Sequence, residues 1–441
     1  MSQPIALRYG KGRVTLDLPD SADVLVGPET PALPDPAAAV RDALRAPIGS
    51  PALRDLAAER KPKSVVVTIS DITRPVPNEL VVGAILEELN AAGVPDSAVT
   101  VLIATGMHRP STPEERDLML GRDLQRRVRV IDHEAKKVET TTRVADDPPV
   151  GVNSLYVEAD LKIVTGLIEP HFMAGFSGGR KGVCPGIVDL DTVQRFHGVG
   201  VMGDPNSVEG RLDGNPCHEE AMRVCGIVGI DFLVNVAITD EREPAGIYAG
   251  DWREAFAAGC ADVARWTSAT LDEPYDLVVT SAGGFPLDKN FYQTVKGMCT
   301  AMPALKEGAT LLMFSACEEI GEPEYVALFD KFGNDWRAFL EHIETSGRTD
   351  KDQWEYQMQT RVLRRIGVDR LVLANDGLDF ATQRRIATTP CPAPAGQPDA
   401  DAATRGQAFI DAFAAANPEA RIAVIPEGPY TMLDAKVLAG V

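Results

Sequence analysis

The stretch LKIVTGLIEPHFMAGFSGGRKGVC, residues 161–184, decides how the chain folds and where its chemistry lies. Its first five residues form a short apolar run that predicts a buried strand. A histidine (His171), a Gly-Gly turn, two cations and a thiol follow this run. Glycines lack a Cβ and let backbone amides approach a phosphate or a flat cofactor, and a lysine after them can pair with that phosphate or attack a carbonyl. The stretch therefore predicts a strand with a binding site at its carboxyl end.

Outward from this stretch, strand-like apolar runs alternate with helical patterns along most of the chain. The strand-like runs are 64–69, 98–104, 127–131, 161–165, 232–238, 276–280, 310–314, 370–374 and 421–425, and the clearest helical patterns are 78–92, 251–267 and 406–415. Such alternation predicts an α/β protein with mostly parallel sheets. We expect two domains: 1–268, which carries the lysine and the histidines, and 274–420, which closes over substrate and cofactor. Residues 421–441 are expected to pack back on the first domain.

Composition restricts the class of protein. The 441 residues carry a net charge of −20, which argues against nucleic acid or an anionic membrane as partner. The amino-terminal sequence has no signal-peptide pattern, and no apolar run approaches the ~18 residues of a membrane span. The seven cysteines are scattered and form no CxxC pair, so we expect neither disulfides nor a structural zinc site. A cytoplasmic protein is predicted.

Four polar motifs come directly after predicted strands. They are DITRP (71–75), ATGMHRP (104–110), EPH (169–171) and SAGGFPLDKNFYQ (281–293). In open parallel sheets, ligands bind beyond the carboxyl ends of the strands. The four motifs therefore predict one shared pocket, in the cleft between the two domains.

The individual motifs each allow a chemical and a purely structural reading. Arg74 can grip a substrate carboxylate, and Asp71 can hold a ribose hydroxyl or orient a histidine, but the two also fit a capped turn with a surface ion pair. His108 suits a general base at a strand end. The STPEE sequence at 111–115 has the spacing of a helix capping box, which can itself position the loop that holds His108.

The later motifs do not match common nucleotide or zinc signatures. His171 and His197 are 26 residues apart, unlike the two histidines of a HExxH zinc helix, and fit a site built from separate loops. The GGRKG run is not a Walker loop, and no GxGxxG follows the first strand. Tyr292 and Lys296 share a helix face, either around substrate or as solvated residues of an amphipathic helix.

Taken together, the motifs resemble the nickel-dependent lactate racemase family. DITRP, ATGMHRP, EPHFMAGFSGGRKGVCPG (169–186), FHG (196–198) and KNFYQTVKG (289–297) occur in the family's order and with similar spacing. The resemblance extends to ARIAVIPEGPY (420–430) and so covers nearly the whole chain. The combination is far more specific than any one motif.

The resemblance implies a cofactor, the nickel-pincer nucleotide, in which two sulfur-containing arms and one ring carbon of a pyridinium mononucleotide hold one nickel ion per chain. It implies a racemase or epimerase of a small 2-hydroxy acid, lactate-like or larger, that moves hydride from C2 through a 2-keto acid, and it implies maturation enzymes as partners. The residue roles that it implies are an acid–base pair, His108 and His171; a covalent cofactor attachment, Lys181; a nickel ligand, His197; cofactor contacts, Asp71, Gly178, Gly179 and Trp354; and substrate contacts, Arg74, Met173, Tyr292, Gln293 and Lys296. Sulfur ligands with one imidazole suit nickel.

Two other functions fit the same residues. A zinc-dependent hydrolase or lyase would use His108, His171 and His197 around the metal. A non-catalytic homologue would keep the cofactor site without turnover. Cys184, three residues after Lys181, fits a small packing residue.

Overall fold

The computed structural model describes residues 3–435, which form two compact units. One unit comprises Glu29–His197 and Asp204–Trp266, and we call it the histidine unit; the other comprises Met1–Pro28, Gly198–Gly203 and Thr267–Val441, and we call it the second unit. Each is built around a largely parallel sheet, which confirms the predicted α/β class.

The histidine unit contains a six-stranded sheet with the order β13-β12-β9-β4-β5-β6. Its strands are β4 (Val65–Ser70), β5 (Val99–Ala104), β6 (Arg129–Asp132), β9 (Leu161–Leu167), β12 (Phe232–Ile238) and β13 (Pro244–Gly250). All neighbours are parallel except β12 and β13. The pairing of Val65 with both Val99 and Leu161 aligns the three central strands, so that their carboxyl ends share one edge.

Helices cover both faces of this sheet because its central strands are apolar on both sides. The helices of this unit are α1 (Pro36–Arg45), α2 (Leu53–Arg60), α3 (Asn78–Ala91), α4 (Pro113–Arg127), α5 (Ser154–Val157), α6 (Leu190–Phe196), α8 (Pro216–Val228) and α9 (Glu254–Thr267). Buried side chains of α1 to α4 join the alternate residues Val65, Val67 and Ile69 of β4 in one core. On the other face, a Cβ at Gly182 would lie 2.7 Å from Val164 Cγ1, which shows how closely the GGRKG segment packs on β9.

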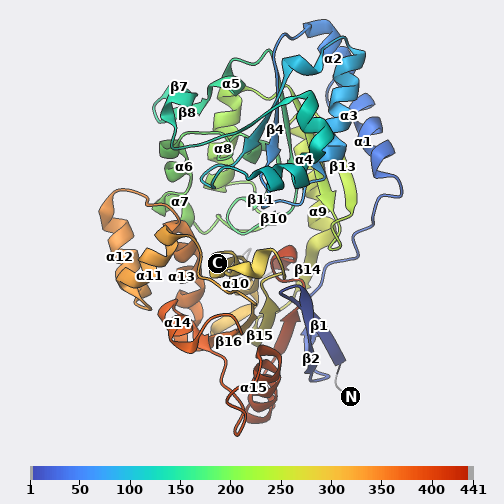
Figure 1. The fold of residues 1–441 in the computed structure, drawn as a ribbon. Helices are drawn as coiled ribbons and strands as arrows, with labels where there is room; N and C mark the ends of the chain where they lie inside the picture. Colours follow the sequence, from blue (N-terminus) through green and yellow to red (C-terminus); the bar gives the residue numbers. More distant parts are fainter. Residues whose placement is uncertain (1–2, 436–441) are drawn as a thin grey trace. The chain divides into compact units, whose positions relative to one another are not determined.

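The second unit is built on another six-stranded sheet, with the order β18-β17-β16-β15-β19-β3 and all pairs parallel. Its strands are β3 (Asp23–Val24), β15 (Tyr275–Ser281), β16 (Leu305–Phe314), β17 (Leu371–Ala374), β18 (Thr389–Pro390) and β19 (Ile422–Ile425). Its helices are α7 (Val199–Gly203), α10 (Phe291–Ala301), α11 (Pro323–Phe332), α12 (Trp336–Ser346), α13 (Gln353–Ile366), α14 (Phe380–Arg385) and α15 (Ala402–Ala416). Figure 1 shows the β1–β2 hairpin and α15 beside this sheet.

The compact units differ from the expected domains at both ends of the chain. The hairpin of β1 (Gln3–Tyr9) and β2 (Gly12–Leu18) packs Leu7 and Leu16 on Leu277, within the second unit rather than in a domain 1–268. Within the expected segment 421–441, β19 pairs with β15 inside the same sheet, and β20 (Met432–Ala435) pairs with β14 (Ser268–Leu271). Over its described part this segment therefore belongs to the second unit, and residues 436–441 lie outside the described residues.

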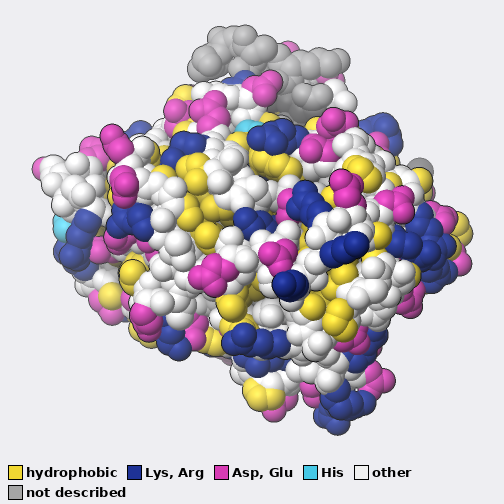
Figure 2. Space-filling model, turned by 90° about the horizontal axis from the view of Figure 1, so that it is seen from above, with side chains coloured by type: hydrophobic (Ala, Val, Ile, Leu, Met, Phe, Trp, Pro, Cys, Tyr) yellow, Lys and Arg dark blue, Asp and Glu magenta, His cyan; other side chains and the backbone are white. Residues whose placement is uncertain are grey.

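The surface carries both signs of charge. On the face drawn in Figure 2, Lys and Arg side chains are interspersed with Asp and Glu. Within residues 3–435, no helix combines the length and the apolar character that crossing a bilayer requires.

Candidate active site

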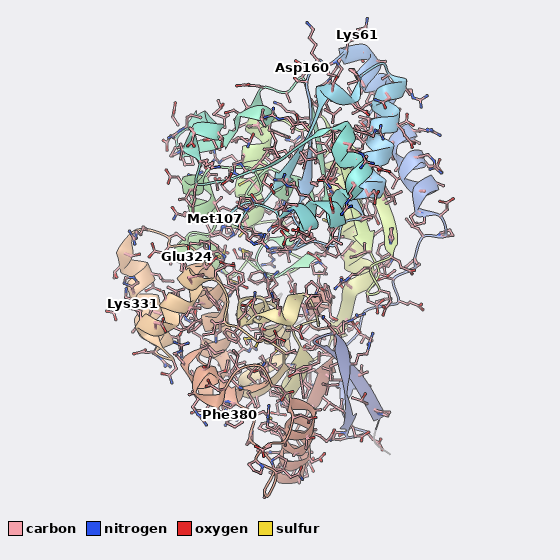
Figure 3. The ribbon with its side chains drawn as sticks, viewed as in Figure 1. Lys61, Met107, Asp160, Glu324, Lys331 and Phe380 are labelled. Carbon is pink, nitrogen blue, oxygen red and sulfur yellow. The ribbon has the colours of Figure 1, made fainter. Side chains whose placement is uncertain are left out.

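The histidine unit gathers its candidate catalytic residues at the carboxyl edge of the sheet. Asp71 and Arg74 follow β4, His108 follows β5, and His171 follows β9. Figure 3 marks the two ends of this sheet: Lys61 and Asp160 lie near the amino end of β4, and Met107 lies at the other end. The structure thus brings together three of the predicted motifs, each by the loop of a parallel strand.

Asp71 and His108 form a hydrogen-bonded pair. His108 Nδ1 lies 2.6 Å from Asp71 Oδ2, and the other carboxylate oxygen of Asp71 accepts from Thr73 Oγ1 at 2.6 Å and from Thr73 N at 3.2 Å. Burial by itself raises the pKa of Asp71, but the charge and hydrogen bond of His108, the Thr73 hydroxyl and the Arg74 charge outweigh it and lower the pKa to about 2. Of the two roles predicted for Asp71, this geometry supports orientation of a histidine; a nucleotide contact stays a prediction.

Arg74 forms an ion pair with Glu169, which is the first residue of the EPH motif. Its Nε lies 2.9 Å from Glu169 Oε1, and both side chains are about one-fifth exposed. An incoming substrate carboxylate would have to share the guanidinium with Glu169, which is possible because the planar group has donors left on its other edge.

His171 lies in a two-strand hairpin, β10 (Pro170–His171) and β11 (Gly175–Phe176). Its Nδ1 accepts hydrogen bonds from the backbone amides of Met173 at 3.4 Å and Ala174 at 3.3 Å, and its Nε2 lies 2.9 Å from Lys181 Nζ. Phe172 stacks on the ring at 5.1 Å between centroids. Two of the predicted site residues, His171 and Lys181, are therefore in direct contact, and Met173, whose side chain is buried, belongs to the turn that holds the histidine.

Gly178 and Gly179 allow the backbone to adopt a conformation that other residues disfavour. Both have positive φ, +72° and +52°, and a Cβ on Gly179 would lie 2.5 Å from Phe256 Cδ2. The Gly179 amide donates to Asn235 Oδ1 at 2.8 Å. Since this amide already has a partner, the glycines are explained by close packing, and their predicted contact with the nucleotide stays a prediction.

Arg180 is a buried cation under this loop. It donates to the carbonyl oxygens of Phe176 at 2.8 Å and Ala174 at 2.6 Å, and its guanidinium lies 4.5 Å from the centroid of the Phe256 ring. Burial lowers the pKa of Arg180 to about 10, which leaves it charged at neutral pH. The residue ties the turn and the second strand of the His171 hairpin to the segment that presents Lys181.

His197 ends α6 and is buried. Its Nδ1 lies 2.9 Å from the Val193 carbonyl oxygen, so Nδ1 carries the hydrogen and Nε2 the lone pair. Burial lowers the pKa of His197 to about 3. A neutral imidazole with its second nitrogen fixed by a backbone carbonyl is the usual form of a histidine that binds a metal through Nε2.

A second cluster of predicted residues lies in the second unit, on α10 and α13. Trp354 Nε1 donates to the Tyr292 hydroxyl at 3.0 Å. Gln293 Oε1 is buried and has no hydrogen-bond partner, which leaves an acceptor for a ligand hydroxyl. Lys296 follows Tyr292 by one helical turn on the same helix, as the spacing predicted.

Glu355 is a member of this cluster that sequence reasoning missed. It is buried, and burial raises its pKa to about 8, with the Lys296 charge acting in the opposite direction and the Asp352 charge adding to the rise. Its Oε1 has no hydrogen-bond partner. A buried carboxyl beside a predicted substrate lysine is typical of a functional site.

Three residues missed in the histidine unit had weak sequence signals. Asn235 stands alone among apolar residues in FLVNVAI, and a single polar residue in a buried strand indicates a buried hydrogen bond. Asn215, before Pro216, is a typical helix N-cap. Glu169 lies in the EPH motif itself. In each case the sequence shows the residue type but not the group with which its side chain interacts.

Comparison with known proteins gives the class. Residues 9–210 match the lactate racemase N-terminal domain, and residues 271–386 match the lactate racemase C-terminal domain. The chain is 31% identical to the lactate racemase of Thermoanaerobacterium thermosaccharolyticum over 441 residues, 96% of this chain and 97% of the relative. It is 35% identical to the lactate racemase of Lactiplantibacillus plantarum over 331 residues, 74% of this chain and 77% of that one.

Solved structures agree in fold. The lactate racemase apoprotein of T. thermosaccharolyticum superposes with a TM-score of 0.88 at 29% identity, covering 98% of this chain and 100% of that chain. A Thermotoga maritima protein shares the fold with a TM-score of 0.67 at 19% identity, covering 91% and 98%. Fold and sequence together define an isomerase of the racemase class. The chain belongs to the lactate racemase family.

Proposed function

We propose that this racemase inverts C2 of a 2-hydroxy acid, lactate or a larger homologue, with a nickel-pincer nucleotide as cofactor. The observation that carries the proposal is the arrangement of His108, His171 and Lys181 at one sheet edge, with each histidine held by its own hydrogen bonds. The two relatives named above are lactate racemases, which supports a substrate of this class.

The residues present fit that cofactor. When bound, it would supply a group that accepts hydride from C2 and returns it to either face of the resulting 2-keto acid. Lys181 would hold it through its amine, and His197 would offer its Nε2 lone pair to nickel. Within residues 3–435, no three His, Cys, Asp or Glu side chains are placed to hold a metal ion, so the remaining ligands would have to come from the organic part of the cofactor.

The chain's own residues would bind substrate and move its proton. His108, with Nδ1 bound to Asp71, has Nε2 available to take the hydroxyl proton, and His171 would be its acid–base partner for the other enantiomer once its Nε2 has given up a proton. Arg74 would orient the substrate carboxylate. Each acid–base group contributes about 10²–10⁴-fold to the rate.

The second cluster would complete substrate binding. Gln293 Oε1 would accept from a substrate or cofactor hydroxyl, and Lys296 would pair with a carboxylate. Trp354 and Tyr292 are joined by a hydrogen bond, and we propose that their aromatic rings contact the pyridinium ring of the cofactor. We propose that enzymes of cofactor synthesis supply the nickel group in the cytoplasm.

The competing zinc hydrolase or lyase has less support. A catalytic zinc site needs about three protein ligands, and the described part of the chain holds no such group. A non-catalytic homologue would have no need for a carboxylate that orients His108, and Asp71 provides one at 2.6 Å.

The test is to co-express the chain with the cofactor-synthesis enzymes and to measure nickel, visible absorbance, intact mass and racemisation of L- and D-lactate. We expect about one nickel per chain with a new absorption band, and turnover with lactate or a larger 2-hydroxy acid. His197→Ala should lose nickel and keep the fold, whereas His108→Ala should keep nickel and lose turnover. Absence of nickel and absorbance, while a lactate racemase loads in the same cells, would refute the proposal.

A further inference from the structure

We infer that His108 and His171 are held in opposite neutral tautomers, and that Asn215 is a positioning residue that fixes the tautomer of His171. His108 would present an unprotonated Nε2 and His171 a protonated Nε2. The assignment of the two histidines as an acid–base pair rests on the proposed function, whereas the tautomers follow from hydrogen bonds in the histidine unit alone.

The tautomer of His108 is set by Asp71. An ionised carboxylate accepts hydrogen bonds and cannot donate one, so His108 Nδ1, 2.6 Å from Asp71 Oδ2, carries the hydrogen. In the neutral ring the lone pair is then on Nε2. His108 is therefore set to accept a proton.

The tautomer of His171 is set by two backbone amides. The N–H groups of Met173 and Ala174 both donate to Nδ1, so this nitrogen must hold the lone pair, and Nε2 carries the hydrogen. In the 2.9 Å hydrogen bond between these two side chains, His171 Nε2 is then the donor and Lys181 Nζ the acceptor. That hydrogen bond needs the lone pair of an unprotonated amine, which is also the nucleophilic form of a lysine.

Asn215 acts on His171 through one peptide group. Its Nδ2 donates to the Met173 carbonyl oxygen at 3.0 Å, and this carbonyl belongs to the same peptide as the Ala174 amide that donates to His171 Nδ1. Hydrogen bonds in such a chain polarise one another, so donation to the oxygen strengthens donation by the N–H. Asn215 thus favours the form of His171 with an unprotonated Nδ1.

The orientation of the Asn215 amide is determined by its other partners. As the N-cap of α8, Asn215 accepts at Oδ1 from Cys217 N at 2.9 Å and from His218 N at 3.4 Å. Two donors on one side require the oxygen there, so the NH₂ group faces the carbonyl oxygens of Met173 and Arg211, both at 3.0 Å. The side chain is fully buried, which removes water as a competitor for these bonds.

The histidine unit is therefore set with one proton acceptor and one proton donor before substrate arrives. Arg180 supports the same turn from the neighbouring peptide, because its Nη2 donates to the Ala174 carbonyl oxygen at 2.6 Å. With both histidines neutral, His108 can take a hydroxyl proton at once, while His171 must first give up the proton on its Nε2.

The test reads the tautomers directly, by ¹⁵N NMR of the histidine-labelled full chain without cofactor, at about pH 8, above the ordinary imidazole pKa of about 6.5. The chain has six histidines, and His108→Gln and His171→Gln assign the two signals. We expect a protonated Nδ1 in His108 and a protonated Nε2 in His171. A protonated Nδ1 in His171, or the same tautomer in both rings, would overturn the inference.

The role of Asn215 is tested with Asn215→Asp. The carboxylate keeps the acceptor for Cys217 and His218, so α8 stays capped, but it cannot donate to Met173. We expect the His171 ring to shift toward protonated Nδ1, with a larger fall in kcat than rise in KM for the loaded enzyme. Asn215→Ser, which also caps but is too short to reach Met173, should shift the ring in the same direction if the aspartate variant does not fold.

A matched control is Asn90→Asp in α3. Asn90 Nδ2 also donates to a backbone carbonyl, that of Val94 at 2.9 Å, but in a helix that carries none of the site residues. This variant should leave the His171 signal unchanged. Unchanged His171 tautomers in both Asn215 variants would refute the positioning role. Because these spectra need neither nickel nor substrate, they remain decisive even if the chain fails to load the cofactor.

Discussion

The hydrogen bond between Asp71 and His108 allows the sharpest test of the site. Asp71→Asn keeps the size of the side chain, but the amide has one acceptor and one donor group in place of two acceptors. An NH₂ group facing His108 would select the tautomer with an unprotonated Nδ1, and the nitrogen needed to accept the substrate proton would then carry a hydrogen. The variant therefore keeps the His108 side chain but changes which of its two ring nitrogens carries the hydrogen.

The expected magnitudes can be worked from the structure. The pKa of Asp71 is lowered from 3.8 to about 2, which corresponds to about 2 kcal/mol of folding free energy. Because the folded pKa is the lower one, this stabilisation is present above about pH 4 and is lost as pH falls toward about 2. Loss of the proton acceptor should cost about 10²–10⁴ in kcat, or about 3–5 kcal/mol of activation free energy.

The assay is racemisation by the nickel-loaded enzyme, alongside urea unfolding of the same samples. We expect Asp71→Asn to lose turnover, keep nickel, and unfold with at most about 2 kcal/mol less free energy at neutral pH. Thr73→Val is the matched control, because it removes the 2.6 Å hydrogen bond to Asp71 Oδ1 but leaves His108 on Oδ2. Turnover of Asp71→Asn within about threefold of the parent, or an equal loss in Thr73→Val, would refute the reasoning that Asp71 acts through His108.

Two further predictions concern stability. Since the folded pKa of Glu355 is raised from 4.5 to about 8, mainly by burial, the free energy of unfolding should fall as pH rises between these values, and Glu355→Gln should remove that dependence in urea titrations at several pH values. An unchanged pH dependence would show that Glu355 is charged beside Lys296. Gly179→Ala should lower the free energy of unfolding by about 1–3 kcal/mol, because φ is positive there and the new Cβ would lie 2.5 Å from Phe256. Gly93→Ala, where φ is +87° but the surrounding space is open, should lower it by about 1 kcal/mol. Equal melting temperatures for the two glycine variants would contradict the packing account.

Local signals in the sequence predicted elements well, and long-range partners poorly. The run 232–238 is β12 as expected, and the Thr112–Glu115 capping box opens α4. The alternating GRVTLDL of β2 indicates a strand with one buried face, but nothing local indicates that this face packs on Leu277, far along the chain. For the same reason, the domain bounds were wrong at the amino terminus.

The site was predictable by residue type but not by hydrogen-bond partner. Motifs after strands located Asp71, His108 and His171 because parallel strands bring their carboxyl ends to one edge. Whether Asp71 orients a histidine or contacts a ribose depends on the direction of its side chain, which the DITRP motif does not determine. The burial of Arg180 likewise depends on where the chain folds back, which its position beside Lys181 does not reveal.

Proton positions distinguish the proposed chemistry from the zinc alternative that the sequence left open. Three histidines around one zinc ion would each offer it an unprotonated nitrogen. His197 can do so through Nε2, because its Nδ1 donates to Val193, and His108 can do so because its Nδ1 donates to Asp71. His171 cannot, because its Nδ1 is occupied by two amide donors and its Nε2 carries the hydrogen that meets Lys181. The zinc site that the sequence left open uses all three histidines, and these tautomers leave it only two. The same residues fit the proposed function, with His197 as metal ligand, His108 as proton acceptor and His171 as proton donor beside Lys181.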